Sequence, residues 1–575
     1  MKHLKYLNKF FWKHKKLLLI GIVFIVIANI FALYPAEFVR KAFDTVLISS
    51  LKKHEAIKVL LKYCSLIILF AVLKGVFMYF MRQTIIVMSR KIEFDLKNEI
   101  YKQYQMLSLQ FYNKNKTGDL MNRISEDVNR VRMYLGPALM YTINITVLFY
   151  LVLNQMFSIN TKLTYFVLIP LPILAITVYI VSNKINYRSE KVQEQLSKLT
   201  SITQETYSAI KIIKTFVNEN NTWKTFNQAC KEYTKRQLHL VKIEAFFFPL
   251  IITLIGMSTI LTIYIGGNES FQNNITTGNI AEFIIYINML AWPVASIGWI
   301  TSLIQRAAAS QERINNFLFL KSDIVNYTEE LTPIRGDINF QDVEFSYGNN
   351  KILKKISFKI KEGSTLGIFG KTGSGKSTIA NLILRLSKVD KGKIMLGNIE
   401  ISKLNLNILR QSIGYVPQDG YLFSGTIKEN IAFSDDRINE EQVMIAAKKA
   451  NIFKEIMNFK SGFDTIIGER GVQLSGGQRQ RLAIARTLYQ NPDIFIFDDC
   501  LSAVDSEKEQ KILYEIKKQS HKKTTIIISH RISSIKNADQ IIILENGNIT
   551  NKGRHKDLVK KEGLYRSIYH EQIKK

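Results

Sequence analysis

The chain contains few cysteines, and none of them is placed for a disulfide or a metal site. Cys64, Cys230 and Cys500 are the three cysteines among 575 residues. Because they are far apart and odd in number, they form neither a disulfide framework nor a metal-binding pattern. We expect ordinary reduced side chains.

The sequence also lacks a basic recognition patch. Its formal net charge is +30, but the lysines are scattered, and no arginine-rich or aromatic-interleaved segment is present. Because a nucleic-acid-binding domain gathers its basic residues on one face, we expect no nucleic-acid partner. Much of the basic excess flanks apolar stretches instead, which indicates a membrane surface.

Charged residues are absent from a long stretch near the amino terminus. Leu17 to Tyr34 (LLLIGIVFIVIANIFALY) is long enough, at about 1.5 Å per residue, to span most of a bilayer core. We predict a membrane helix that ends near Pro35, because the run is too long for a signal peptide and no small-residue cleavage site follows it.

Further apolar runs fill the first part of the chain. The predicted spans are about 17–36, 58–82, 133–158, 162–182, 244–266 and 279–305. The sequence therefore predicts an all-α transmembrane domain of six helices at 1–320, a linker at 321–334 and a second domain at 335–575.

Positive charge lies on one side of the spans. Lysine and arginine crowd the amino terminus and the two long connections, roughly 82–132 and 183–242, whereas the short loop 266–279 has neither. By the positive-inside rule, the amino terminus and both long connections are cytoplasmic. Their helical apolar spacing predicts cytoplasmic helical hairpins that need something to contact.

A few residues stand out within the spans. Asn29 and Lys74 would mark a transport pathway, although a snorkelling side chain explains Lys74 equally well. Trp292, Pro293 and Trp299 would line a cavity or kink a helix, with interface and packing roles as the alternative. No substrate-binding residue is assigned on this basis.

The pattern changes to strand alternation after Arg335. ISFKI (356–360) is predicted as a half-buried strand and TLGIF (365–369) as a buried one, followed by GKTGSGKST and a helical run. Strand, glycine loop and helix in this order are the context of a phosphate-binding loop. The predicted ATP-binding residues of this loop are Gly370, Lys371, Thr372, Gly373, Ser374, Gly375, Lys376, Ser377 and Thr378.

Specific roles follow from the chemistry of this loop. Lys376 would reach the β and γ phosphates, and the Ser377 hydroxyl would coordinate magnesium. We also predict that IFIF (494–497) is the neighbouring parallel strand. It would deliver Asp498 to the magnesium ion and Asp499 to the attacking water.

The sequence contains a second glycine-rich segment directly before a predicted helix. LSGGQ comprises Leu474, Ser475, Gly476, Gly477 and Gln478, and a helical run follows it. Alone it would be a capped helix after a turn. Together with the loop at Gly370, it resembles the signature of ABC transporter ATPases. The resemblance covers essentially the whole chain, as six spans followed by an α/β P-loop nucleotide-binding domain, which is the arrangement of an exporter-type half-transporter.

The resemblance implies roles for single residues. Tyr347, in FSYG, is similar to the aromatic side chain that stacks on adenine. Gln418 resembles the glutamine that senses magnesium and the attacking water, and His530 resembles the switch histidine that contacts the γ phosphate. Asp505, in SAVD (502–505), belongs to a segment similar to the loop at the dimer seam.

The resemblance also implies a dimer and a coupling route. In this family the glycine loop of one chain faces the LSGGQ of the other. FYNKNKTGDL (111–120) and QETYSAIKIIKTF (204–216) resemble the two coupling segments, and GERG (468–471), with Glu469, resembles the exporter segment that contacts the cytoplasmic hairpins.

One residue departs from the family pattern. Most members have glutamate after the magnesium aspartate, where this chain has Asp499. The shorter side chain withdraws the carboxylate by roughly 1.5 Å, and a misplacement of about 1 Å can cost 10²-fold in rate. We therefore expect slow ATP hydrolysis at this site, as in the weakened site of asymmetric exporters. A heterodimer is the leading hypothesis and a homodimer the alternative.

The sequence thus predicts an ATP-driven translocase. It would use ATP and Mg²⁺ to export an amphipathic small molecule, drug or lipid across the plasma membrane, in contact with membrane lipid. An ATP-gated channel or regulator of the same architecture is the alternative, although no long disordered regulatory insert favours it. An importer is disfavoured because the spans precede the ATPase in one chain, and no protease domain indicates a peptide-processing role.

Overall fold

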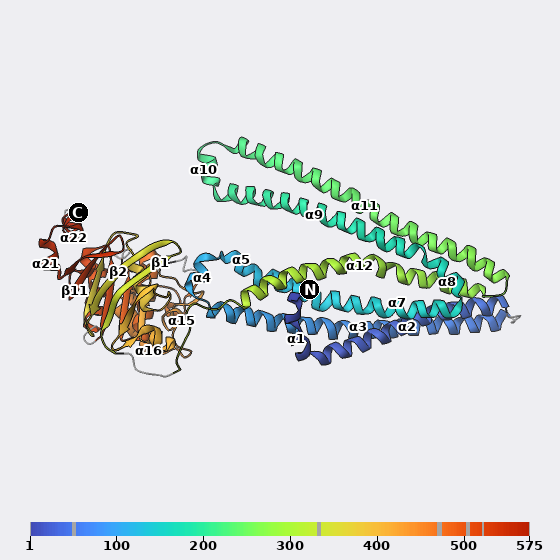
Figure 1. Ribbon diagram of the computed structural model, residues 1–575, viewed down its shortest axis with the longest axis horizontal. Coiled ribbons are helices and arrows are strands. Elements are labelled where there is room, and N and C mark those ends of the chain that lie inside the picture. Colours follow the sequence, from blue (N-terminus) through green and yellow to red (C-terminus); the bar gives the residue numbers. More distant parts are fainter. Residues whose placement is uncertain are drawn as a thin grey trace. The chain divides into compact units, whose positions relative to one another are not determined.

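The structure is a computed structural model that describes residues 2–48, 53–329, 335–468, 474–501, 506–519 and 523–573. The chain divides into two compact units. Unit 1 comprises Met1–Gln105 and Thr117–Leu320, and unit 2 comprises Met106–Lys116 and Lys321–Lys575. Unit 1 is helical, whereas all described strands belong to unit 2 (Figure 1). This confirms the predicted fold class, an all-α membrane domain followed by an α/β domain.

Six helical segments among the described residues are long and apolar enough to cross a membrane. They are Lys15–Val46, His54–Met106, Thr117–Ile159, Thr161–Ser208, Glu219–Phe271 and Thr277–Leu318. The helices of unit 1 are η1 (Lys2–Leu7), α1 (Asn8–Lys13), α2 (Lys15–Ile48), α3 (Lys53–Met106), α5 (Thr117–Asn122), η2 (Arg123–Asp127), α6 (Val128–Met133), η3 (Tyr134–Ala138), α7 (Leu139–Ile159), α8 (Thr161–Leu168), α9 (Pro170–Ser208), α10 (Ile210–Thr215), α11 (Glu219–Phe271) and α12 (Thr277–Leu318).

The predicted end of the first membrane helix near Pro35 is wrong. Helix α2 continues through Pro35 to Ile48. A proline removes one hydrogen-bond donor, but packing against neighbouring helices compensates for this loss in a membrane helix. Here Ala36, the next residue, is fully buried in an apolar cluster with residues of α7 and α12. Pro170 does coincide with a boundary, since α8 ends at Leu168 and α9 starts at Pro170.

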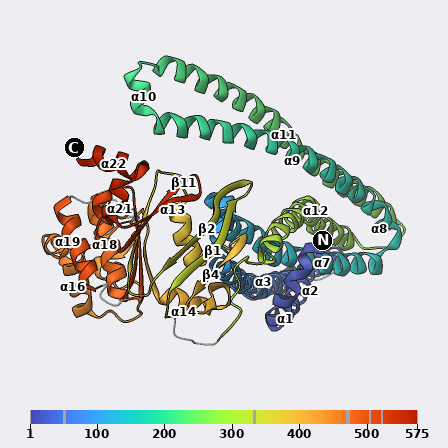
Figure 2. The same cartoon turned by 60° about the vertical axis from the view of Figure 1, so that its left-hand side comes forward.

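Helices α9 and α11 run side by side as a long pair joined by α10 (Figures 1 and 2). The Gln195 amide donates a 3.0 Å hydrogen bond from α9 to the carbonyl of Ala229 on α11. At the tip, Tyr207 is 73% exposed, Ile212 61% and Phe216 77%. An apolar tip of this kind has no cover within its own unit, which is the usual mark of a contact surface.

Asn29 has a structural partner within the spans. Its side chain is 5% exposed and donates a 2.8 Å hydrogen bond to the Asn144 carbonyl oxygen, which joins α2 to α7. Interhelical amide bonds of this kind stabilise membrane bundles. The contact favours a packing role for Asn29 over a place in a transport pathway. Lys74 is exposed on α3.

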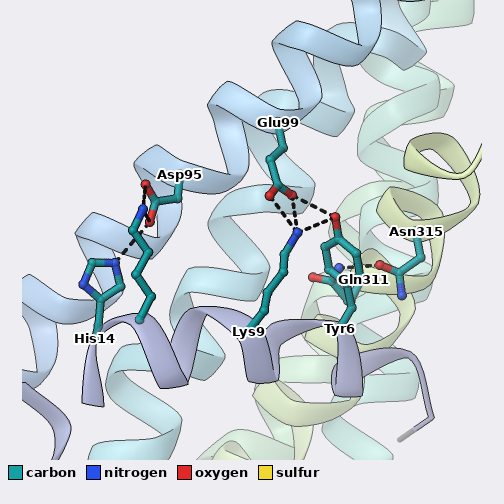
Figure 3. A network of polar contacts seen from close by, with 8 residues as sticks. Tyr6, Lys9, His14, Asp95, Glu99, Gln311 and Asn315 are labelled. Atoms are coloured by element: carbon teal, nitrogen blue, oxygen red, sulfur yellow. Dashed lines mark hydrogen bonds and ion pairs between the residues drawn. The ribbon is translucent and has the colours of Figure 1, made fainter. Parts of the chain in front are cut away.

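The amino-terminal helices η1 and α1 are tied to α3 by charged groups (Figure 3). Lys9 donates hydrogen bonds of 2.6 and 2.8 Å to the Glu99 carboxylate, which also accepts a 2.8 Å bond from the Tyr6 hydroxyl. One turn away, Lys13 lies 2.8 Å from Asp95. These paired carboxylates explain part of the lysine excess at the amino terminus.

Unit 2 contains three sheets within the described residues. Their strand orders are β2-β1-β4-β5, β12-β11-β3-β10-β9-β6 and β7-β8. The strands are β1 (Ile338–Tyr347), β2 (Asn350–Ile360), β3 (Thr365–Phe369), β4 (Lys391–Leu396), β5 (Ile399–Glu400), β6 (Ile413–Val416), β7 (Gly425–Thr426), β8 (Ile466–Ile467), β9 (Ile494–Asp498), β10 (Thr524–Ser529), β11 (Gln540–Glu545) and β12 (Asn548–Gly553).

The helices of unit 2 complete the fold. They are α4 (Leu109–Lys114), α13 (Lys376–Ile383), η4 (Ile401–Lys403), α14 (Leu406–Gln411), α15 (Ile427–Ile431), α16 (Glu440–Lys449), α17 (Phe453–Met457), η5 (Gly462–Asp464), α18 (Gly476–Gln490), α19 (Ser506–Gln519), α20 (Ile532–Ile535), α21 (His555–Lys560) and α22 (Leu564–Ile573).

The prediction that IFIF neighbours the glycine-loop strand is wrong. Strand β10 lies between β3 and β9 and pairs in parallel with both. Its sequence TTIIIS is fully buried, as a central strand covered on both faces requires. Adjacency of parallel strands cannot be read from their order in the chain, because the crossover connections allow another strand to enter between them.

Two apolar clusters cover the six-stranded sheet. Along β9, Phe495 and Phe497 belong to one cluster, while Ile494 and Ile496 belong to the other. Alternation with period two therefore explains why the strand is apolar at every position. With both faces covered, the carboxyl edge of the parallel strands is the place where polar residues are expected to act.

Candidate functional site

The carboxyl ends of four parallel strands share one edge of the six-stranded sheet. Phe369 of β3 is paired with Ser529 of β10, and Asp498 of β9 with Ile528 of β10. Val416 of β6 is paired with Phe497. The residues that follow these strands are thereby brought to one place: the glycine loop after β3, His530 after β10, Asp499 after β9 and Gln418 after β6.

The loop between β3 and α13 requires glycine at several positions. A Cβ at Gly370 would clash with the carbonyl oxygen of Leu544 and lie 2.7 Å from the Ser374 hydroxyl. Gly373 and Gly375 have φ angles of 81° and 101°, which L-residues rarely adopt. Gly375 is also the N-cap of α13, so the loop leads directly into a helix amino terminus that attracts anions.

Two side chains of the loop are suited to a phosphate group. Lys376 folds over the loop, where its ammonium donates 2.8 Å hydrogen bonds to the carbonyls of Gly370 and Lys371. Burial lowers the pKa of Lys376, although the carboxylates of Asp499 and Asp498 oppose that shift. The Ser374 hydroxyl is buried and has no hydrogen-bond partner among the described residues. A bound triphosphate would supply acceptors for both groups.

Asp498 and Ser377 offer a pair of oxygen ligands. Asp498 is 3% exposed and accepts hydrogen bonds from the hydroxyls of Ser377 and Tyr415, the latter at 3.3 Å. Burial raises the pKa of Asp498, and the two hydrogen bonds oppose this shift. Carboxylate and hydroxyl oxygens are ligands that Mg²⁺ prefers. Among the described residues, no group of three or more His, Cys, Asp or Glu side chains is arranged to hold a metal ion by itself.

Asp499 and His530 are in direct contact. The His530 Nδ1 atom lies 2.9 and 2.8 Å from the two carboxylate oxygens of Asp499. Asp499 has a φ angle of 47°, a conformation that aspartate tolerates better than most residues, and its amide donates to the Ile528 carbonyl at 2.9 Å. The backbone of Asp499 is thus held by β10, and its carboxylate is held by the imidazole.

Gln418 and Tyr347 lie around this centre. The Gln418 side chain is exposed, and the backbone carbonyl of Gln418 accepts a 3.3 Å hydrogen bond from the side-chain amide of Gln480 on α18. Tyr347 is the last residue of β1, in the four-stranded sheet, and its ring centroid lies 4.8 Å from that of Phe345. The pKa of Tyr415 is raised by burial first and by Asp498 next, with Cys500 and Tyr347 adding to the shift.

The LSGGQ segment forms a capped helix start. The Ser475 hydroxyl accepts a 3.2 Å bond from the Gln478 amide, and the Gln478 side chain accepts a 2.9 Å bond from the Ser475 amide. Ser475 is thereby the N-cap of α18, and the Leu474 carbonyl accepts a bond from Arg479 at 2.9 Å. No hydrogen bond among the described residues joins Leu474–Gln478 to the loop Gly370–Thr378.

Glu455 anchors this segment and was not predicted from the sequence. Its carboxylate, on α17, accepts two 2.8 Å bonds from Arg481, a 3.1 Å bond from Gln478 and a 3.0 Å bond from Lys508. The hydrogen bond from Arg481 is the main cause that lowers the pKa of Glu455 to about 2. Arg481 was the available signal, because a guanidinium within a helix of mostly apolar buried residues needs a counter-charge.

Two predicted residues lie outside the described part of the chain. Asp505, with the rest of SAVD, lies outside the described residues, and so does Glu469 of the GERG segment. The structure therefore brings together the glycine loop, Asp498, Asp499 and His530, and gives Ser475 its place at a helix start.

Comparisons with known proteins agree with this geometry. Residues 18–294 match a family model described as ABC transporter transmembrane region, and residues 353–502 match one described as ABC transporter. The chain is 33% identical over 573 residues to the probable multidrug resistance ABC transporter ATP-binding/permease protein YheI of Bacillus subtilis, covering 99% of this chain and 97% of the relative. It is 32% identical over 556 residues to the multidrug resistance-like ATP-binding protein MdlA of Escherichia coli, covering 96% and 93%.

A solved structure shares the fold. It is described as a bacterial Atm1-family ABC exporter with ATP bound. The TM-score is 0.81 at 24% identity, over 97% of this chain and 99% of the other.

We expect Glu455→Gln to destabilise the start of α18. The folded-state pKa of Glu455 lies below the ordinary value of 4.5, so its stabilisation is fully present above about pH 4.5 and is lost as the pH falls toward about 2. The substitution should lower the free energy of local opening by about 2–3 kcal/mol at pH 7, a difference that shrinks toward pH 2. Hydrogen exchange of the α18 amides measures it.

Glu440→Gln serves as the matched control for this experiment. Glu440 is 75% exposed and pairs with Lys428 at 3.6 Å, so its removal should leave α18 unchanged. Equal protection of α18 in the wild type and in Glu455→Gln at pH 7 would contradict the anchoring role.

Proposed function

Because this chain belongs to the ABC transporter family, we propose that it exports an amphipathic small molecule, drug or lipid across the plasma membrane. Membership rests on both family models and on relatives that match nearly the whole chain. The chain is a multi-pass membrane protein whose ATPase domain drives export. The named relatives are multidrug resistance proteins, and that supports a drug-like substrate.

The carboxyl edge of the six-stranded sheet supports ATP binding most directly. The loop Gly370–Thr378 would enclose the phosphates, with Lys376 released from the carbonyls of Gly370 and Lys371 to pair with them. Ser377 and Asp498 would hold Mg²⁺, which neutralises phosphate charge when bound. Tyr347 would stack on the adenine ring.

Asp499 and His530 would position the attacking water. Asp499 would accept a hydrogen bond from the water and orient it. His530, whose Nδ1 lies 2.8 Å from the Asp499 carboxylate, would hold the acid in place and contact the γ phosphate. Gln418 would contact the ion and the water. The carboxylate of an aspartate reaches less far than that of a glutamate, so this site would bind ATP firmly and turn it over slowly.

We propose that two chains complete the site. Ser475 begins a helix that no described hydrogen bond ties to the glycine loop of its own chain, so its anion-binding end is available to another chain's nucleotide. Asp505 would lie at the same seam. Asp499 favours a heterodimer whose second chain carries glutamate at the equivalent position, and a homodimer is the alternative.

Two segments of the first half would couple ATP binding to the spans. The first is 111–120. Its first six residues lie in Met106–Lys116, a stretch that contains α4 and belongs to unit 2 although it precedes the third span. The apolar tip around α10, within 204–216, is exposed and would be the second coupling segment. We place the amino terminus and the nucleotide domain in the cytoplasm, as the basic connections require.

Inside-out membrane vesicles test the function. With ATP outside, wild-type vesicles should accumulate a fluorescent amphiphile, because the nucleotide domain faces the medium. Lys376→Ala should abolish uptake by removing the phosphate contact. Uptake that is independent of ATP, or an ATP-gated current across a planar bilayer, would contradict an export pump.

Asp499→Glu tests the weakened site. The longer side chain should return the carboxylate to the water and raise ATP turnover roughly tenfold or more. The φ angle of 47° suits glutamate less than aspartate, which opposes part of the gain. Steady-state ATPase activity of the purified assembly measures it, with Asp499→Asn as the control that should lose activity. Unchanged or lower turnover in Asp499→Glu would show that carboxylate reach is not limiting.

A further inference from the structure

The carboxyl-terminal helix α22 is anchored in the apolar core of unit 2. Tyr565 is 1% exposed and belongs to the same cluster of buried residues as Phe369 and Ile532. Its ring centroid lies 5.2 Å from that of Phe369, the last residue of β3 before the glycine loop. Three further residues of the helix pack against this cluster, namely Leu564, Ile568 and Tyr569. The spacing of three to four residues between these positions places them on one face of α22.

Gln572 lies on the same face of α22, two turns beyond Tyr565. It follows Tyr565 by seven residues, which is about two turns of an α-helix. The side-chain oxygen of Gln572 accepts a 2.9 Å hydrogen bond from the Ile532 amide, and its side-chain nitrogen donates a 3.1 Å bond to the His530 carbonyl. One side chain therefore bridges the backbone on both sides of Arg531.

The start of α20 explains why an acceptor is needed at this place. Ile532 is the first residue of α20, and the first amides of a helix have no acceptor within the helix. Arg531 occupies the N-cap, and its side chain has no acceptor atom. Gln572 thus provides, from a distant part of the chain, the acceptor that a serine or an aspartate at the N-cap would provide.

The second hydrogen bond of Gln572 holds the backbone of His530. The imidazole is held by Asp499, whose carboxylate oxygen lies 2.8 Å from Nδ1. That contact restrains the ring but not the peptide group that follows His530, at the junction of β10 and α20. The bond to the His530 carbonyl restrains this peptide group. The two contacts together define the direction in which the imidazole points.

Helix docking alone does not account for an amide at this position. Gln572 is exposed, so it adds little apolar burial to the contact that Tyr565 and its neighbours already make. The two backbone groups that it meets are one donor and one acceptor. A side-chain amide offers both kinds of atom at one end, whereas a carboxylate offers acceptors only and a lysine donors only.

We propose that Gln572 is a positioning residue for His530, through which the carboxyl-terminal helix sets the direction of the imidazole in the nucleotide site. The proposal rests on the proposed function in assigning the γ-phosphate contact to His530. The two hydrogen bonds of Gln572 themselves require no nucleotide.

Two substitutions separate the two hydrogen bonds. Gln572→Met keeps the length of the side chain and removes both bonds, while Gln572→Glu keeps an acceptor for the Ile532 amide and removes the donor to His530. The readout is hydrogen exchange at the Ile532 amide, resolved by fragmentation mass spectrometry of the full-length transporter in lipid nanodiscs. Exchange should become about three- to tenfold faster in Gln572→Met and stay near the wild-type rate in Gln572→Glu.

The position of the imidazole is measured by chemical modification. Trypsin releases residues 524–531 as TTIIISHR, in which His530 is the single histidine. Diethyl pyrocarbonate modifies histidine, and mass spectrometry of this peptide gives the rate at His530 whatever the partner chain is. A non-hydrolysable ATP analogue with Mg²⁺, at a concentration that saturates each variant, should slow the modification of the wild type. This protection should fall at least about threefold in Gln572→Met and in Gln572→Glu.

Glu571→Gln is the matched control for both measurements. Glu571 precedes Gln572, is exposed, and has no hydrogen bond or ion pair among the described residues. Its substitution should leave the exchange at Ile532 and the protection of His530 unchanged. The amides of α22 should keep their protection in all three variants, because Tyr565 still anchors the helix.

Three results would overturn the proposal. They are unchanged exchange at Ile532 in Gln572→Met, equal protection of His530 in the wild type and in Gln572→Met, and loss of protection throughout α22, which would reduce Gln572 to a docking residue. Weakened protection of His530 in a protein that shows no ATP-driven uptake would leave the role of Gln572 standing and defeat the export function. Equal protection in a protein that does export would defeat the role of Gln572 alone.

Discussion

The parallel pairing of β3, β10 and β9 is the constraint on which the nucleotide site depends. Each strand is short and buried, so the polar residues that follow it in the sequence lie at the carboxyl edge of the sheet. That edge brings the glycine loop, the Asp498–Asp499 pair and His530 together from three distant parts of the chain. A one-residue slip of β9 would turn Phe497 away from its cluster and move both acids, so the two apolar clusters that fix the register also fix the chemistry.

Electrostatics then prepare the site for a charged ligand. Burial disfavours the charged forms of Lys376 and Asp498. The lysine donates hydrogen bonds to loop carbonyls, and the aspartate accepts hydrogen bonds from the hydroxyls of Ser377 and Tyr415. The Ser374 hydroxyl has no hydrogen-bond partner among the described residues. A magnesium triphosphate would relieve all three costs at once, which is a physical reason for the loop to bind it with its metal ion.

Much of this could be predicted from the sequence because the decisive signals are local. Leu17 to Tyr34 without charge, and strand, glycine loop and helix around Gly370, are each complete within about 20 residues. What could not be predicted depends on packing across the chain. Pro35 does not end its helix because Ala36 is buried against helices more than 100 residues away, and β10 enters the sheet between β3 and β9.

Side-chain partners escaped prediction for the same reason. Glu455 is an unremarkable acid in KEIM, and only the fold brings it to Arg481 and Gln478. Tyr141 is one of many tyrosines until α7 places it between Trp292 and Trp299. The sequence did single out both tryptophans, but it left open whether they line a cavity, kink the helix, lie at the interface or pack against neighbouring helices.

The central claim is that one nucleotide is held by the glycine loop of this chain and by the LSGGQ helix of a second chain. The most direct measurement is a disulfide crosslink between Ser374→Cys and a cysteine at the second chain's equivalent of Ser475, in a background where Cys64 and Cys230 are replaced by serine and the two chains carry different tags. With nucleotide trapped, we expect a crosslinked product that carries both tags, and much less of it without nucleotide. If the two-tag product never forms under trapping, or if the link joins Ser374 and Ser475 positions of the same chain, the shared site is contradicted.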